Sequence, residues 1–201
     1  MTAPLAPLPP LHPKTTTFLF MDFQNGVTSR IGDQAAQLFG RAASVLDAAR
    51  AAGAGVVFVR VAFREGCPEL GEDHRMAAVV KQMGGLRLDA EETQIVAALA
   101  PRATEPVVVK HRVGPFLGTD LTPILSARRT ETLVLLGVAT SGVVLSTVRH
   151  AADADYRVVV VEDACADADP EVHRVLMEKV FPRQAVVTRS DAVVAALTRP
   201  V

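Results

Sequence analysis

The sequence predicts a three-layer α/β/α sandwich built on a six-stranded, mostly parallel β-sheet. Apolar runs alternate with helical patterns along the chain, and this β-α order is typical of such a domain. The runs are apolar at successive residues rather than at alternate ones, which indicates strands that are covered on both faces. With 201 residues, 49% of them hydrophobic, the chain is long enough for one domain with a substantial core, whereas two would be cramped.

Six apolar runs are the predicted strands. In chain order they are Thr16–Asp22, Gly55–Ala62, Pro106–Lys110, Thr132–Val138, Arg157–Glu162 and Ala185–Thr188. The proline-rich residues 1–14 precede the first of them and are expected to form an extended arm. Residues 15–201 are therefore predicted to be the single folded domain.

Six segments between and after these strands are the predicted helices. They are Gln34–Ala52 (ending at Gly53), Ala90–Ala100, Asp120–Arg128, Gly142–Ala154, Pro170–Phe181 and Asp191–Thr198. Thr119, Ser141, Asp169 and Ser190 stand where N-caps are expected, and Pro170 suits a first helical position.

Charge and composition exclude several classes of partner. The formal net charge is −1 and the Lys and Arg residues are scattered, so neither nucleic acid nor an anionic membrane surface is an expected partner. The N-terminus has no basic region and too many prolines for a signal peptide or a spanning helix, so a cytoplasmic location is expected. Cys67 and Cys165 are too few for a disulfide framework and are expected to be free thiols.

Three polar features fall at the carboxyl ends of predicted strands, where folds of this class place their functional crevice. Asp22 ends the first strand, Lys110 ends the third, and Ser141 to Val143 open the helix after the fourth. Each has an ordinary alternative as a turn residue, a solvated side chain or a tight turn. Together, an acid and a base beside helix-N-terminal amides predict an acid/base and oxyanion site.

Motifs that span most of the chain resemble those of the isochorismatase-like (cysteine hydrolase) superfamily. The matching segments are Phe20-Met-Asp22-Phe-Gln24, Lys110 with the following Gly114-Pro-Phe116-Leu-Gly118-Thr119, the turn Gly137–Thr147, and the late segments Asp163–Asp167 and Pro170–His173. They occur in the family's order. The resemblance implies a Rossmann-like fold, a small-molecule substrate and a homo-oligomer, a dimer or tetramer.

The resemblance also implies roles for individual residues. Many relatives carry a nucleophilic cysteine in a Gly-φ-Ala-Thr-x-x-Cys pattern, and counting from Gly137 places that position on Val143. The peptide between Val138 and Ala139 is expected to be cis, with the amides of Ala139 and Val143 forming an oxyanion hole. Residues expected to bind substrate are Gln24, Phe116, Thr140, Ser141 and Gly142.

Arg64 follows the second strand on the crevice side and is a further candidate for substrate binding. A guanidinium there could clamp a carboxylate through two parallel hydrogen bonds, although a plain surface arginine is the alternative. The nicotinamidase branch of the family holds a metal through an Asp-x-His motif, but the corresponding region here reads Arg60-Val-Ala-Phe-Arg64. We therefore expect neither a metal nor a cofactor.

Three functional hypotheses are compatible with the sequence. The favoured one is a hydrolase of the isochorismatase type without a covalent intermediate, in which Asp22 acts as general acid/base beside Lys110 and the substrate is a vinyl ether. The second is an amide hydrolase that uses activated water or the relocated thiol of Cys165. The third is a catalytically silent relative that binds a small molecule or a partner.

Overall fold

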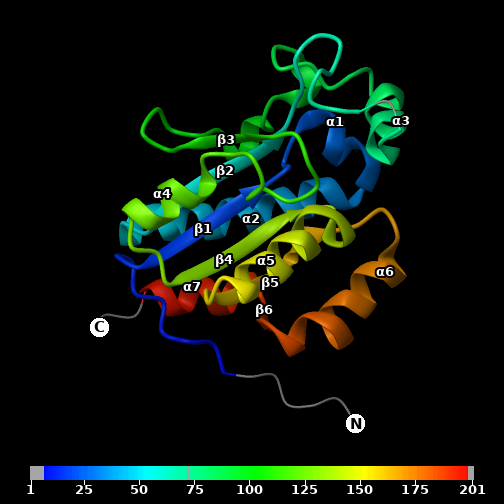
Figure 1. The fold of residues 1–201 in the computed structure, drawn as a ribbon. Coiled ribbons are helices and arrows are strands. Elements are labelled where there is room, and N and C mark those ends of the chain that lie inside the picture. The colour runs from blue at the N-terminus through cyan, green and yellow to red at the C-terminus, as the bar shows by residue number, and fades with distance from the viewer. Residues whose placement is uncertain (1–6, 72, 199–201) are drawn as a thin grey trace.

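The computed structural model describes residues 7–71 and 73–198 and shows a single sheet of parallel strands (Figure 1). The six strands lie in the order β3-β2-β1-β4-β5-β6. Their bounds are β1 Thr16–Met21, β2 Gly55–Val61, β3 Val107–Lys110, β4 Thr132–Val138, β5 Arg157–Ala166 and β6 Val186–Thr188. The predicted α/β fold is therefore confirmed, and the order reverses between β1 and β4.

Helices cover both faces of the sheet. Helices α2 (Gln34–Ala52) and α7 (Ser190–Thr198) pack on one face, against side chains that include Phe18 and Phe20 of β1. Helices α4 (Leu121–Ala127) and α5 (Leu145–Asp153) pack on the other face, against Leu19 and Met21 of the same strand. Successive residues of β1 thus enter opposite cores, which is why the run is apolar at every position.

The helix after β5 continues through three different geometries. It comprises α6 (Pro170–Val175), a π-helical turn η5 (Leu176–Val180) and a 3₁₀ turn η6 (Phe181–Arg183). The predicted cap at Asp169 is present, because its carboxylate accepts from the amides of Glu171 and Val172. Ser190 is instead the first residue of α7, and its hydroxyl donates to Asp163.

The predicted arm lies partly within the described residues. Leu11 is buried and Leu8 is partly buried, and both pack against the core on the α2 side. Residues 1–6 of the predicted arm lie outside the described residues. The segment just before β1 therefore contributes to the core.

The helix predicted at Ala90–Ala100 is wrong. The structure has two short 3₁₀ turns there, η2 (Glu91–Thr93) and η3 (Ala97–Leu99), separated by an extended stretch. Ile95 forms an antiparallel bridge with Gln24, and the Val96 amide donates to the Phe23 carbonyl at 2.9 Å. Pairing with the segment after β1 satisfies these backbone groups better than an isolated helix would, so tertiary contacts override the helical pattern.

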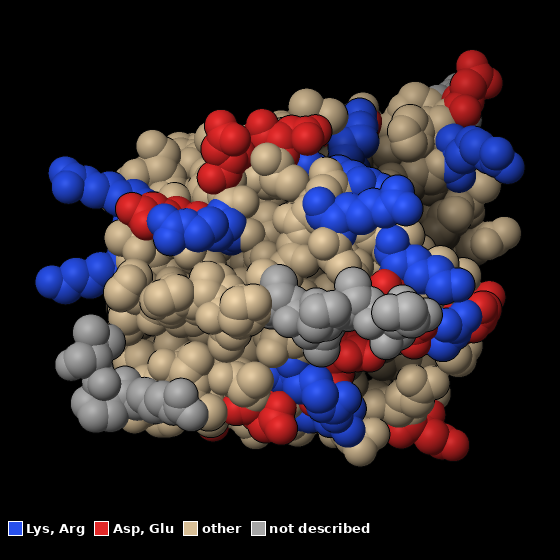
Figure 2. Space-filling view, turned by 90° about the horizontal axis from the view of Figure 1, so that it is seen from below, with Lys and Arg blue, Asp and Glu red and all other residues tan. Residues whose placement is uncertain are grey.

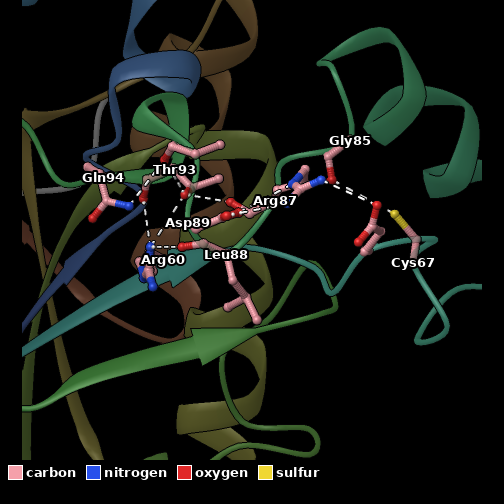
Figure 3. Close-up of polar contacts among 10 residues, drawn as sticks. Arg60, Cys67, Gly85, Arg87, Leu88, Asp89, Thr93 and Gln94 are labelled. Carbon is pink, nitrogen blue, oxygen red and sulfur yellow. Dashed lines mark hydrogen bonds and ion pairs between the residues drawn. The ribbon is translucent and has the colours of Figure 1, made fainter.

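The long connection between β2 and β3 is held by Arg60, a residue of β2 (Figure 3). Its guanidinium donates to the carbonyl of Leu88 at 3.1 Å and to that of Thr93 at 3.4 Å. The Thr93 hydroxyl donates in turn to the carbonyls of Arg87 and Ala90. This network fixes a connection that also carries α3 (Arg75–Gln82), a helix that was not among the predicted ones.

The surface carries charges of both signs. Figure 2 shows Lys and Arg next to Asp and Glu over the face that it presents, with no field of one sign. Among the helices in the described part of the chain, none combines the length and apolarity needed to cross a membrane.

Candidate active site

Asp22 lies at the point where the strand order reverses. Met21 pairs with Gly137 across β1 and β4, and a Cβ on Gly137 would stand 2.8 Å from the Met21 carbonyl oxygen. Only glycine permits this approach of the two backbones. Asp22, which has a positive φ of 55°, therefore leaves the sheet directly beside Val138 and the turn that follows it.

Asp22 and Lys110 form a buried ion pair across β2. The Lys110 Nζ lies 2.9 Å from Asp22 Oδ2, and the two side chains are only 3% and 7% exposed. Lys110 Nζ also donates to the carbonyl of Arg112 at 3.1 Å. Asp22 Oδ1 is buried and has no hydrogen-bond partner among the residues that the structure describes. One carboxylate oxygen is thus fixed by the ammonium, and the other is available to a bound molecule.

Burial dominates the ionisation of this carboxyl group. Desolvation raises the pKa of Asp22, while the charge of Lys110 and the hydrogen bond from its ammonium oppose that rise. The net direction is upward, so Asp22 holds its proton to a higher pH than an exposed aspartate does. This direction is the one that a proton donor requires.

The turn after β4 has the geometry that the resemblance implies. The peptide bond between Val138 and Ala139 is cis. It leads into the π-helical turn η4 (Thr140–Val144), which runs on into α5. The turn is held from outside, because the Ser141 amide donates to Asp167 Oδ2 at 2.7 Å and Thr140 Oγ1 lies 2.8 Å from His173 Nδ1.

A cavity of about 520 Å³ opens at this junction. Asp22, Lys110, Ala139, Gly142 and Val143 all line it, so these five predicted site residues come together. Val143 is 2% exposed and belongs to the core cluster on the α5 side. Most of the remaining lining is aliphatic and comes from β2, α3 and the segment after β1.

Two predicted substrate-binding residues, Thr140 and Ser141, lie in the turn but are not among the residues that line the cavity. Thr140 is fully buried and its hydroxyl contacts His173. Ser141 is exposed, its side chain does not cap the helix, and the predicted N-cap is therefore wrong. The cause is that the helical turn starts at Thr140, so Ser141 lies inside it and offers its backbone amide to Asp167.

Three other predicted substrate-binding residues, Arg64, Phe116 and Gln24, are not among the residues that line this cavity. The guanidinium of Arg64 pairs with Glu69 at 2.6 Å and is 66% exposed. The Phe116 ring is buried and stacks on His150, with centroids 4.0 Å apart. Gln24 is fully buried, and both ends of its amide bond to backbone groups.

Gln24 joins β2 to the connection that follows it. Its Nε2 donates to the carbonyls of Val61 and Thr93, both at 2.9 Å, and its Oε1 accepts from the Val61 amide at 2.8 Å. Val61 in turn lines the cavity. The side chain therefore positions the cavity wall.

Replacing Gln24 by Leu is expected to lower the free energy of unfolding by about 3 kcal/mol, because buried backbone groups lose their partners. Chemical denaturation of the purified variant measures this change. Gln94→Leu is the matched control, since Gln94 is exposed, and its unfolding free energy should stay within about 0.5 kcal/mol of the parent value. Equal effects of the two substitutions would contradict the positioning role.

Neither cysteine reaches the cavity. Cys165 pairs with Gly137 inside the sheet, and its Sγ lies 3.8 Å from the carbonyl of Leu135. Burial raises the pKa of the Cys165 thiol to about 12, so almost no thiolate forms near neutral pH. Cys67 lies in the loop after β2, with its Sγ 3.8 Å from the Gly85 carbonyl (Figure 3), and it too is absent from the cavity lining.

Two arginines and the helices α1 and α3 contribute to the cavity but were not predicted from the sequence. Arg30, in the 3₁₀ turn η1 (Ser29–Ile31), and Arg75, the first residue of α3, both line the cavity and are exposed. The short helix α1 (Asn25–Thr28) precedes them and also contributes to the wall through Val27. A hydrophobic pattern at Met76, Val79, Val80 and Met83 could have indicated α3, because this spacing marks one face of a helix.

Residues 7–71 and 73–198 bring no three His, Cys, Asp or Glu side chains together in an arrangement that could hold a metal ion.

A parallel α/β sheet whose switch point opens into a cavity with a buried acid–ammonium pair is typical of enzymes that act on small molecules. The family model described as "Isochorismatase domain" matches residues 16–192. The chain therefore belongs to the isochorismatase family, and it is a hydrolase.

Individual relatives agree with this membership. The chain is 31% identical to the isochorismatase family protein YecD of Escherichia coli O157:H7, over 93% of this chain and 98% of that protein. It is 29% identical to the ureidoacrylate amidohydrolase RutB of Acinetobacter baylyi, over 85% of this chain and 78% of that protein. The solved structure of an isochorismatase family protein from Burkholderia thailandensis superposes with a TM-score of 0.81 at 28% identity, covering 92% of this chain and 97% of that chain.

Proposed function

We propose that this hydrolase acts on a small molecule without a cysteine nucleophile, with Asp22 as general acid and Lys110 as its electrostatic partner. The observation that carries the proposal is the state of the Asp22 carboxyl group. It is buried, burial raises its pKa, and its Oδ1 has no partner among the described residues. The cavity that it lines contains Val143 and neither cysteine of the chain.

Hydrolysis of a vinyl ether is the reaction that this arrangement serves best. Protonated Asp22 donates its proton to the terminal carbon of the C=C–O unit, and the π electrons form the new C–H bond. The oxocarbenium ion that remains is attacked by water, and the resulting hemiketal loses its alcohol and leaves a carbonyl compound. The proton released by the attacking water returns to Asp22, so the catalyst is regenerated.

Lys110 and the turn after β4 are positioned to stabilise the charges that develop during these reaction steps. The ammonium 2.9 Å from Asp22 Oδ2 stabilises the carboxylate that forms when the proton leaves. Ala139 and Val143 line the same cavity, and their backbone amides are proposed to donate hydrogen bonds to the substrate oxygen. The side chain of Val143 adds an apolar wall that limits the access of water.

Hydrolysis of an amide by activated water is the second candidate, and the likeness to the amidohydrolase RutB favours it. The same pair would act in the opposite sense, with ionised Asp22 as a base that takes a proton from water. The upward direction of the Asp22 pKa argues against this order of events near neutral pH, because it reduces the fraction of the base form.

The test is turnover of isochorismate and simple enol ethers, compared with a matched panel of primary amides. We expect turnover of the ethers, and we expect it to be unchanged after treatment with iodoacetamide and in the variants Cys165→Ala and Cys67→Ala. Turnover confined to amides would reject the vinyl-ether reaction. Activity that disappears in Cys165→Ala but survives in Cys67→Ala would reject the mechanism without a thiol.

A further inference from the structure

We infer that the cavity selects an amphipathic acid, with an apolar body that fills the aliphatic chamber and a carboxylate that lies between Arg30 and Arg75 at its mouth. The inference deepens the proposed function and rests on it for the identity of the site. It specifies a class of substrate from the chemistry of the lining, which is mostly aliphatic along the wall and carries the exposed Arg30 and Arg75.

The aliphatic part of the cavity, called the chamber below, suits an apolar ligand group. Its wall includes Val27, Ile31, Val61, Met76, Val80 and Leu86, side chains that have no hydrogen-bonding capacity beyond the weak sulfur acceptor. A cavity of about 150 Å³ with such a lining accommodates benzene. The volume of about 520 Å³ is more than three times larger, so it has room for a ring together with a chain of several methylene groups.

The charged side chains of the lining differ in burial. Asp22 and Lys110 are buried and therefore mark the floor, whereas Arg30 and Arg75 are exposed and mark the mouth. Among the described residues that line the cavity, Asp22 is the one acidic residue, against the three cationic side chains Arg30, Arg75 and Lys110. This balance of charge in the described lining favours an anionic ligand.

The two arginines come from different elements that both contribute to the cavity lining. Arg30 belongs to η1, after β1, and Arg75 begins α3, in the connection after β2. Figure 1 shows α3 lying next to α1 at one end of the sheet. Both arginines line the cavity, and guanidinium groups suit a planar carboxylate because it accepts paired N–H donors.

This placement sets the length of the substrate. The bond that reacts must reach Asp22 at the floor, and the acid group must remain at the mouth, so the two are separated by the apolar body. The ligand proposed here is consequently an acid whose carboxylate is remote from the reacting bond.

Binding of unreactive probes tests the inference separately from the chemistry. Isothermal titration of 4-phenylbutyrate is compared with butyrate, which has the charge without the ring, and with 4-phenylbutanol, which has the ring without the charge. We expect 4-phenylbutyrate to bind at least about tenfold more tightly than either probe, because each lacks one of the two matched features. Similar affinities for the acid and the alcohol would overturn the role of the arginines.

Matched variants locate the two features. Arg30→Gln and Arg75→Gln are each expected to remove most of the preference for the acid over the alcohol, whereas Arg64→Gln, away from the cavity, should preserve it. Val79→Asp places a carboxylate on the wall, since Val79 lines the cavity and is 43% exposed; Gln82→Asp makes the same charge change on α3 outside the lining. Weaker 4-phenylbutyrate binding in both aspartate variants alike would overturn the assignment of the chamber.

Failure of the proposed substrate class can be distinguished from failure of the proposed reaction. Asp22→Asn removes the proposed acid but leaves the chamber and both arginines, so it should retain the affinity for 4-phenylbutyrate. Binding that persists in this variant while wild-type turnover of enol ethers is absent would reject only the reaction. Turnover with no preference for 4-phenylbutyrate would reject only the substrate class.

Discussion

Asp22→Asn is expected to lower kcat/KM by about 10³-fold, the range that a positioned general acid contributes. The amide keeps the size of the side chain and can still accept from Lys110 Nζ, which lies 2.9 Å from Oδ2 in the parent protein. It cannot release a proton to carbon. Steady-state kinetics with the best enol ether of the panel measures the loss, and thermal unfolding verifies that the variant is folded.

Asp47→Asn is the control for this substitution, because Asp47 is exposed on α2 and should leave kcat/KM unchanged. A second observable follows from the direction of the Asp22 pKa, which burial raises. If the protonated form is the active one, kcat/KM of the wild-type enzyme falls as the pH rises through that pKa. An Asp22→Asn variant that keeps its activity within a factor of about ten would refute the assigned role.

The sheet was predictable because its signal is local. Runs such as Thr132–Val138 are apolar over most of their length, and the structure buries this run at every position, as expected of a strand covered on both faces. The position at which a strand ends depends more on contacts with distant residues. β5 continues to Ala166, beyond the predicted Glu162, because a register shift between Leu135 and Gly137 lets its last residues pair with the end of β4.

The error at Ala90–Ala100 has the same physical origin. The helical pattern there is real in the sequence, but the segment lies beside Phe23 and Gln24, and their backbone groups and the Gln24 amide need partners. These hydrogen-bond partners are about seventy positions away in the chain. A local hydrophobic pattern therefore contains no sign of them. Burial without hydrogen bonds would cost more than the helix contributes.

The candidate site was predictable where its residues end strands. Asp22, Lys110 and the turn to Val143 all lie at the carboxyl edge of the sheet, and parallel pairing brings that edge together. For residues outside the strands, strand pairing does not determine where the side chain lies. Arg64 was chosen because it follows β2 directly, yet the chain turns it to Glu69, while Arg75, farther along the same connection, reaches the cavity.

The Asp22–Lys110 pair also has a consequence for stability. Lys110→Met is expected to lower the free energy of unfolding by about 3–5 kcal/mol at pH 8, because it leaves an unpaired carboxylate in a buried position. Without the ammonium the folded-state pKa of Asp22 rises further above its unfolded value of about 3.9. The contribution of Asp22 is then fully present below the unfolded pKa and is lost as the pH rises through the folded pKa.

The difference in unfolding free energy between Lys110→Met and the wild type should therefore be largest at alkaline pH and shrink toward acid pH, as urea denaturation at a series of pH values can show. The double variant Asp22→Asn/Lys110→Met removes the titrating group, so it should recover much of the stability and lose the additional pH dependence. A deficit of the same size at every pH would mean that the lost contacts of the lysine chain, including its bond to the Arg112 carbonyl, dominate instead. The pH dependence thus separates an uncompensated charge from lost contacts, and it does so without any substrate.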